Sequence, residues 1–243
     1  MRTIAAIVGV VSLAAVDYTA QAGASPGGGG GCAAYNSHVP PGKHFSKAID
    51  NPYFPLPVGR TFVYRGVENG KKELDRMHVT GKTKHVAGIT ATVVSDNVYE
   101  PPPKLLEKTF DYYAQDDHGN VWYLGEDTRE FLSGGKVDRS GSWLAGVKGA
   151  KPGLIMKANP QVPDAYRQEC LSGEAEDLAW VVARGGSVKV PVGRFHPVVR
   201  TLEFSQLEPA IVERKVYAPR VGIVSEHQLS GGHETLKLVR VTG

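Results

Sequence analysis

The chain has 243 residues, of which 41% are hydrophobic and 22% charged, and its formal net charge is +3. Its positive residues are scattered: Lys104 and Lys108 are separated by apolar and acidic residues, and Arg184, Lys189 and Arg194 lie among Gly, Val and Pro. This distribution lacks the basic stripe that nucleic-acid binding requires, so we expect no nucleic-acid partner.

The first 22 residues are typical of a cleaved export signal. Arg2 supplies one positive charge, an apolar run extends to Asp17, and Ala20-Gln21-Ala22 has the small-x-small pattern of a signal-peptidase site. The alternative is a membrane anchor, but the run is shorter than the ~20 residues that span a bilayer. We expect a secreted or extracytoplasmic protein of the cell envelope, with no transmembrane segment after removal of residues 1–22.

Residues 23–47 are predicted to form a flexible leader, because Gly27–Gly31 and Pro40-Pro41-Gly42 bury little surface. Cys32 follows these glycines, too far from the apolar run for the acylated cysteine of a lipoprotein. Cys32 and Cys170 are the only cysteines, so one long-range disulfide is chemically allowed in an exported chain. The alternative is two unpaired thiols, one in the leader and one in a strand.

Residues 48–243 are predicted to form a single antiparallel β domain, because short runs rich in Val, Thr, Tyr, Phe and Ile alternate with Gly, Pro or Asn-Gly. The fold class is all-β, with one strongly curved sheet (a barrel or half-barrel) and one short helix at about Gly173–Val182. No segment supplies the crossover helices that parallel strands need. The predicted strands are Thr61–Val67, Leu74–Val79, Ala91–Tyr99, Leu105–Ala114, Asn120–Leu124, Arg129–Leu132, Lys136–Trp143, Leu154–Lys157, Ala165–Cys170, Ser187–Val190, Val198–Ser205, Ile211–Tyr217, Gly222–Gln228 and Glu234–Val241.

The stretch from Thr109 to Thr128 predicts a hairpin and contains many of the aromatic residues and carboxylates that we consider below. Period-2 alternation places Trp122 and Leu124 on one face of its second strand and Tyr123 on the other. The turn at 116–120 is acidic, and such residues favour turn conformations without any bound ion.

Four motifs lie along the predicted β domain: Asn51-Pro52-Tyr53-Phe54-Pro55-Leu56 with Gly59 and Tyr64, the block Asp111 to Thr128, Trp143-Leu144-Ala145-Gly146 with Pro152-Gly153, and Ala218-Pro219-Arg220-Val221-Gly222-Ile223-Val224. Together they resemble a widespread family of exported, functionally uncharacterised bacterial β proteins, from about residue 48 to the C-terminus. The C-terminal pattern is also similar to periplasmic half-barrels related to lipoprotein carriers. The second resemblance implies a curved antiparallel sheet with a concave apolar face, and neither family supplies catalytic residues.

The predicted ligand site combines aromatic residues, as pocket wall, with carboxylates at the rim. Aromatic side chains provide large contact area with a polar handle, although they are equally suited to fill a β core. The strand after Trp122 runs through Gly125 directly into two acids, so an apolar wall would end in charge. The predicted ligand-binding residues are Tyr113, Trp122, Tyr123, Glu126, Asp127 and Trp143.

Metal, cofactor and catalytic patterns are weak in this sequence. Asp116, Asp117, Glu126 and Asp127 could offer oxygens to Ca²⁺, but their spacing does not fit a calcium loop, and the histidines show no ligand spacing. We therefore expect no metal and no cofactor. The densest charged cluster could include a general acid–base pair, but solvated strand or helix faces give the same density; it comprises Arg167, Glu169, Glu174, Glu176 and Asp177.

Three functions follow from these patterns. The first is binding of a small apolar or amphipathic molecule by an exported β-barrel or half-barrel. The second is hydrolysis or isomerisation of such a molecule by a carboxylate pair inside the barrel, and the sequence leaves open whether the protein is an enzyme. The third is a non-catalytic structural protein of the envelope, which would have a filled core and an exposed apolar patch.

Overall fold

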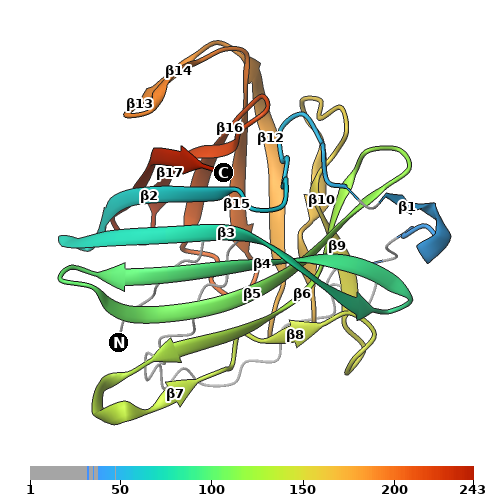
Figure 1. Ribbon diagram of the computed structural model, residues 1–243, viewed down its shortest axis with the longest axis horizontal. Helices are drawn as coiled ribbons and strands as arrows, with labels where there is room; N and C mark the ends of the chain where they lie inside the picture. Colours follow the sequence, from blue (N-terminus) through green and yellow to red (C-terminus); the bar gives the residue numbers. More distant parts are fainter. Residues whose placement is uncertain (1–31, 33–34, 36–37, 47) are drawn as a thin grey trace, which may run out of the picture.

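The computed structural model describes residues 32, 35, 38–46 and 48–243 (Figure 1). The predicted export signal and most of the predicted leader lie outside the described residues. No helix in the described part of the chain is both long and apolar enough to cross a bilayer. The elements are the 3-10 turns η2 (Gly42–His44) and η3 (Ser133–Gly135) and the strands β1 (Phe45–Ser46), β2 (Thr61–Glu68), β3 (Lys71–Val86), β4 (Ile89–Glu100), β5 (Lys104–Asp116), β6 (Val121–Phe131), β7 (Val137–Asp138), β8 (Trp143–Leu144), β9 (Lys151–Met156), β10 (Ala165–Arg167), β11 (Glu169–Cys170), β12 (Asp177–Gly185), β13 (Val188–Val190), β14 (Gly193–Phe195), β15 (Val198–Ser205), β16 (Val212–Ala218), β17 (Gly222–Ser230) and β18 (Glu234–Thr242).

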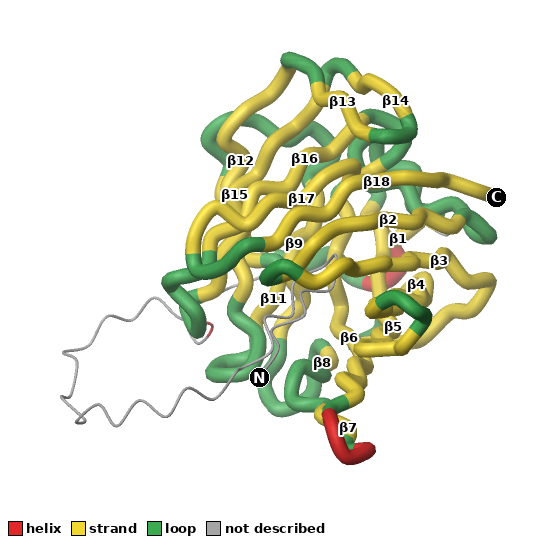
Figure 2. The backbone as a smooth tube through the Cα atoms, turned by 90° about the vertical axis from the view of Figure 1, so that its left-hand side faces the viewer, coloured by secondary structure: helices red, strands yellow, loops and turns green. Residues whose placement is uncertain are grey.

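All strands except β13 and β14 form one antiparallel sheet that curls into a nearly closed barrel (Figures 1 and 2). Its order is β10-β12-β15-β16-β17-β18-β2-β3-β4-β5-β6-β9-β11, so the last strand of the chain pairs with β2. The two edge strands, β10 and β11, follow each other in the chain and are joined by Gln168. The Gln168 backbone N–H donates to the carbonyl of Asp177 in β12 at 2.8 Å, so the two edges of the sheet lie close together. The prediction of a single, strongly curved antiparallel sheet is confirmed.

Turn residues explain why the neighbouring strands form hairpins. Asn69 and Gly70, between β2 and β3, both have positive φ (46° and 83°), the backbone of the tight turns that suit twisted strands. The hairpin predicted at 109–128 is present as β5 and β6, and both strands are longer than predicted. Asp116 closes its turn by accepting the backbone N–H groups of His118 and Asn120.

The predicted helix at Gly173–Val182 is wrong, because its second half is strand β12. Ala179 and Val181 are buried on one face, whereas Trp180 between them is 45% exposed, so the burial has period 2. The acids before Leu178 resemble a helix N-terminus in sequence, but pairing with β15 decides the structure. The predicted strand at Ser187–Val190 is present as β13, which pairs with β14 in a separate two-stranded sheet.

The Asn51–Leu56 motif packs against one end of the hairpin β5–β6. The Asn51 side chain donates to the carbonyls of Gly119 (2.8 Å) and Lys157 (3.1 Å) and accepts the backbone N–H groups of Tyr53 and Phe54. The Phe54 ring then meets the Tyr113 ring edge-on at 5.4 Å between centroids. This part of the resemblance is therefore explained by structure, because the motif fixes the chain against the barrel core.

Cys32 and Cys170 form a disulfide, with 5.3 Å between their Cα atoms and a sequence separation of 138. Both cysteines are buried. Cys32 thus connects the segment before the barrel to β11.

Reduction of this disulfide is expected to destabilise the protein by roughly 5 kcal/mol, because closing so long a loop restricts the unfolded chain. Melting temperature with and without reductant, together with a thiol titration under denaturing conditions, measures this. A Cys32→Ala/Cys170→Ala double variant is the control and should not respond to reductant. Two titratable thiols in the oxidised protein would rule out the bridge.

Candidate functional site

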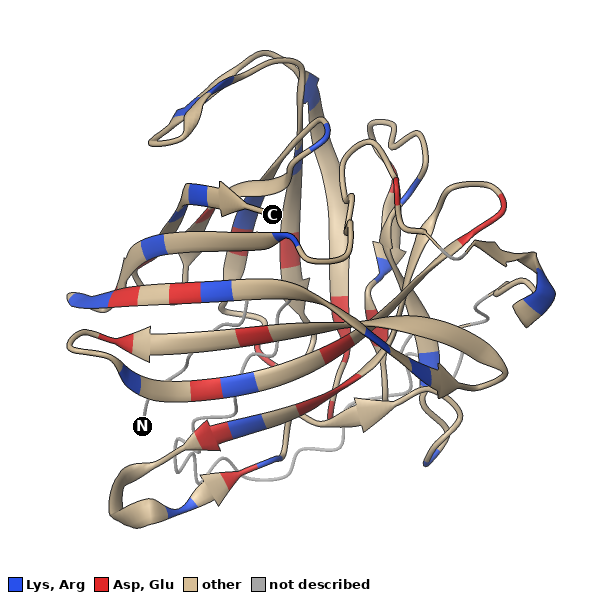
Figure 3. Ribbon diagram, viewed as in Figure 1, with Lys and Arg blue, Asp and Glu red and all other residues tan. Residues whose placement is uncertain are grey.

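The inner face of the barrel carries a band of buried acids across neighbouring strands. Figure 3 shows the positions of acidic residues along β3 to β6. The strand register places these residues on one face, since Asp111 lies opposite Glu126 and Glu107 opposite Glu130. We call this set the acidic band: Glu73, Asp75, Asp96, Glu107, Asp111, Glu126, Glu130, Glu203, Glu213, Glu226 and Glu234. Among the buried side chains of the described residues, the only bases are Arg167 and Lys215.

The same face becomes apolar toward the other end of the strands. Tyr64 follows Phe62 in β2, and Met77 and Val79 follow the acids of β3, all of them buried in the main core. On β5, Tyr113 succeeds Asp111 two residues later. On β3 and β5 the inner face therefore changes from acidic to apolar or aromatic side chains.

Asp111, Tyr123 and Glu126 form a hydrogen-bonded chain at the boundary between the two halves. The Tyr123 hydroxyl lies 2.8 Å from Asp111 Oδ1 and 3.0 Å from Glu126 Oε2. A phenol has one hydrogen, so it donates to one carboxylate, and the other carboxyl must be protonated to donate in turn. In agreement, burial raises the pKa of both acids well above the ordinary range.

Trp143 connects this chain to a surface pocket. Its ring meets the Tyr123 ring edge-on at 5.3 Å between centroids, and Tyr123 in turn stacks on Tyr113 at 4.8 Å. The pocket has a volume of about 200 Å³, and we call it the Trp143 pocket. It is lined by Lys84, Tyr112, Glu126, Ser142, Trp143, Leu144, Val147, Lys148, Leu171 and Glu174.

A second, larger pocket of about 430 Å³ lies between the segment Gly42–Ser46 and the β3–β4 hairpin. Its lining is Gly42, Phe45, Ser46, Thr83, Gly88, Thr90 and Thr92, which includes none of the predicted site residues. Because this lining has no titratable side chain, it offers hydroxyl and apolar contacts but no acid–base chemistry. The Trp143 pocket is therefore the better candidate site in spite of its smaller volume.

The structure brings four of the six predicted site residues together and separates the other two. Tyr113, Tyr123, Glu126 and Trp143 form the group described above. Trp122 and Asp127 lie on the opposite face of β6 from Tyr123, as strand alternation and the bulge at Gly125 require.

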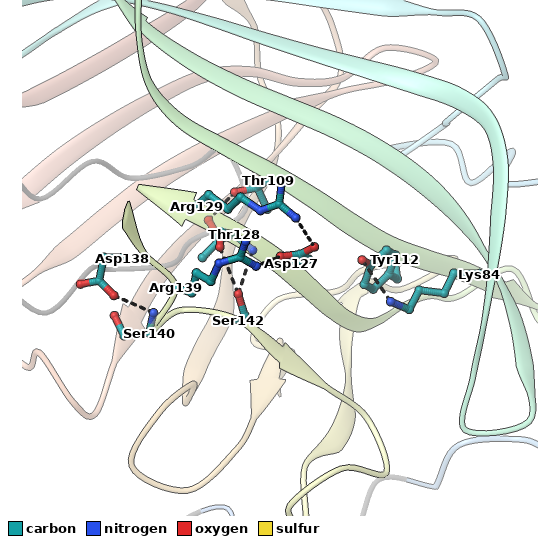
Figure 4. A network of polar contacts seen from close by, with 10 residues as sticks. All are labelled: Lys84, Thr109, Tyr112, Asp127, Thr128, Arg129, Asp138, Arg139, Ser140 and Ser142. Atoms are coloured by element: carbon teal, nitrogen blue, oxygen red, sulfur yellow. Dashed lines mark hydrogen bonds and ion pairs between the residues drawn. The ribbon is translucent and has the colours of Figure 1, made fainter. Parts of the chain in front are cut away.

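Trp122 and Asp127 each have local partners on that face. The Trp122 indole N–H donates to Asp116 Oδ2 at 2.8 Å, and the ring is buried in the main core. Asp127 pairs with Arg129 at 3.2 Å and Arg139 at 3.5 Å, within a polar network beside Lys84 and Tyr112 (Figure 4). These contacts favour structural roles for both residues.

The expectation that Glu126 is a solvated rim carboxylate is wrong, because this side chain is 3% exposed. The reason is a β-bulge opposite Asp111 and Tyr113, where β6 contains one extra residue. Gly125 occupies it with φ +132°, and a Cβ there would meet the Trp143 carbonyl oxygen. The bulge directs the Glu126 side chain to the inner face of the sheet, where it belongs to the acidic band.

The charged cluster of residues 167–177 does not form a single acid–base site. Glu169 is buried, and burial raises its pKa, whereas the nearby Trp143 indole opposes this shift. Glu174 instead pairs with Lys148 at 3.7 Å near the surface, and Arg167 lies 4.0 Å from Glu176.

Most of the acidic band was not identified from the sequence. A signal was present, because acids alternate with residues of the opposite face and continue into buried apolar or aromatic positions, as in Glu73-x-Asp75-x-Met77 and Glu213-x-Lys215-x-Tyr217. Sequence alone cannot show that these strands are neighbours.

Similar solved structures include a proposed exported protein with a YmcC-like fold from Bacteroides fragilis, at a TM-score of 0.46 and 16% identity over 79% of this chain and 100% of that chain. A proposed lipoprotein from Parabacteroides distasonis is similar at a TM-score of 0.42 and 12% identity, again over 79% of this chain and 100% of that chain. No protein-family model and no curated protein matches the sequence.

Proposed function

We propose that the chain is an exported protein that binds a small amphipathic molecule in the Trp143 pocket. The observation that carries this proposal is the pocket lining, in which Tyr112, Trp143 and Leu144 lie beside Lys84 and Glu126. Apolar walls with a few polar groups are the usual composition of ligand sites. Support for export comes from the signal-peptide pattern of residues 1–22.

The lining also suggests which ligand fits best. A volume of about 200 Å³ is below the range of drug-sized sites, so the ligand is a short chain or a single ring. Lys84 and Lys148 supply two ammonium groups, of which Lys148 pairs with the Glu174 carboxylate at 3.7 Å, whereas burial favours the protonated, neutral form of Glu126. An anionic head group is therefore favoured over a cationic one.

A matched series of six-carbon probes tests this proposal. We expect hexanoate to raise the melting temperature most, hexanol less and hexylamine least, because the ammonium groups of the lining attract an anion. The alkyl chain is the same in all three probes, so differences between them report on the head group. Native mass spectrometry of protein purified from its own host would show whether a small molecule is bound. Equal responses to the three probes would contradict the proposed head group.

Two valines with similar exposure provide a variant and its control. Val147 lines the pocket and is 49% exposed, whereas Val137 is 47% exposed on β7 and outside the lining. Val147→Asp is expected to weaken hexanoate binding at least tenfold, since it places a carboxylate beside the anionic head group, and Val137→Asp should leave it unchanged. The pocket assignment fails if both variants bind hexanoate as the wild type does.

The hydrogen-bonded carboxyl pair favours a second candidate function, which is hydrolysis of a molecule bound in this pocket. Acid–base hydrolysis needs one group that donates a proton and one that accepts it. Here the Tyr123 hydroxyl bridges the Asp111 and Glu126 carboxyls, and Glu126 lines the pocket. Release of 4-nitrophenolate from 4-nitrophenyl hexanoate would reveal it, and Asp111→Asn should abolish this release. Asp138→Asn, on β7 and outside the pocket lining, is the control. Binding of hexanoate without any turnover of the ester would favour the binding protein.

A further inference from the structure

Three glutamates of the acidic band converge at one end of the barrel. Glu213, Glu226 and Glu234 lie on the neighbouring strands β16, β17 and β18, and one oxygen of each lies within 4.8 Å of the others. Glu234 is the first residue of β18, directly after the turn that follows β17. The cluster is therefore near a strand end, although all three side chains are buried.

Three carboxyl oxygens of this cluster are buried without a hydrogen-bond donor. Both carboxyl oxygens of Glu226 and Oε1 of Glu234 are buried without a hydrogen bond, on side chains that are 2% and 3% exposed. Buried polar atoms in proteins nearly always have a partner, and an exception requires an explanation such as an ion. These unpartnered atoms belong to the residues whose oxygens converge.

One ammonium group, that of Lys215, lies near the cluster. Lys215 Nζ lies 3.1 Å from Glu203 Oε2 and 3.8 Å from Glu226 Oε2, so the closer of these two contacts is with Glu203. The other charged groups around the cluster are acids, namely Glu68, Glu73, Asp75 and Asp96. Buried acidic side chains thus outnumber buried basic ones on the strands from β15 to β4.

We propose that Glu213, Glu226 and Glu234 bind a hard divalent cation of the calcium type. Three carboxylates supply the oxygen ligands that Ca²⁺ prefers, and the remaining positions of its coordination sphere can be filled by water. The three glutamates offer neither sulfur nor imidazole, the ligands that select zinc or copper. This site lies on other strands than the Trp143 pocket and is independent of the proposed function.

Calcium titration of chelator-treated protein tests the site. We expect one Ca²⁺ per chain by calorimetry and a melting temperature that rises with Ca²⁺ and then saturates, because a ligand that binds only the folded state stabilises it. Terbium should bind the same site, and its luminescence should increase when tyrosine is excited. Tyr64 and Tyr217 are the tyrosines near the site, since the charge of Glu226 acts on both.

Single substitutions localise the ion. Glu226→Gln and Glu234→Gln keep the side-chain volume and are each expected to weaken Ca²⁺ and Tb³⁺ binding at least tenfold. Glu107→Gln makes the same change elsewhere in the acidic band and should leave binding as in the wild type, and Val147→Asp should do so as well. Circular dichroism confirms that each variant is folded.

Two results would overturn the proposal. The first is the absence of any heat, melting shift or terbium signal at millimolar Ca²⁺ or Tb³⁺. The second is binding that Glu226→Gln and Glu234→Gln leave unchanged, which would assign the ion to another place.

Discussion

Replacing Lys215 with methionine is expected to lower the free energy of unfolding by about 3–5 kcal/mol, the cost of leaving a buried charge without its partner. The Lys215 ammonium is buried 3.1 Å from Glu203 Oε2. Burial alone would raise the Glu203 pKa, but Lys215 and hydrogen bonds from Thr201 and Tyr217 hold it below its ordinary value. Glu203 is therefore ionised in the folded protein and depends on the ammonium group.

The double variant Lys215→Met/Glu203→Gln is the control, because it removes both charges with little change of volume. It should recover a large part of the lost stability, since a neutral pair has no uncompensated charge. Urea unfolding in the presence of a chelator measures the wild type, both single variants and the double variant. A loss below about 1 kcal/mol for Lys215→Met would show that water or another group already compensates Glu203.

Much of the fold could be predicted from the sequence because its signals are local. Period-2 runs and turn pairs such as Asn69-Gly70 specify strands and hairpins within a few residues. Closure of the barrel depends instead on the pairing of β18 with β2, whose residues are far apart in the chain. The segment Gly173–Val182 was misassigned because its local composition suits a helix, whereas its contacts with β15 form only in the folded protein.

The candidate site was predicted in part for a related reason. Strict alternation from Tyr123 would place Gly125 and Asp127 on the inner face and Glu126 on the outer face. The bulge at Gly125 reverses this order, so Glu126 joins Tyr123, and Asp127 pairs with arginines outside. The cluster of Glu213, Glu226 and Glu234 requires the register of three strands, which no single segment reveals.

The stability of the protein is expected to fall as the pH rises from about 5 to 8, in contrast to proteins whose ionised acids stabilise the fold. Burial raises the pKa of Glu107 from 4.5 to about 8, although the Thr109 hydroxyl opposes the shift, and burial raises the Glu73 pKa to about 8 as well. An acid with a raised pKa retains its proton in the folded state while the unfolded chain has already released it. Each of these acids therefore makes its full contribution to the free energy of unfolding below pH 4.5, and this contribution is lost as the pH approaches 8.

Glu107→Gln isolates one such contribution. Glutamine is neutral at every pH, so the variant should match the wild type near pH 4.5 and exceed its free energy of unfolding at pH 8 by a few kcal/mol, given about 1.4 kcal/mol per pKa unit. Urea unfolding with a chelator at several pH values measures the difference. Asp138→Asn is the control of opposite sign, because hydrogen bonds from Ser140 lower the Asp138 pKa and confine its effect to acidic pH. Parallel curves for the wild type and Glu107→Gln between pH 5 and 8 would mean that Glu107 is ionised in the folded barrel, which would require a cation or water beside it.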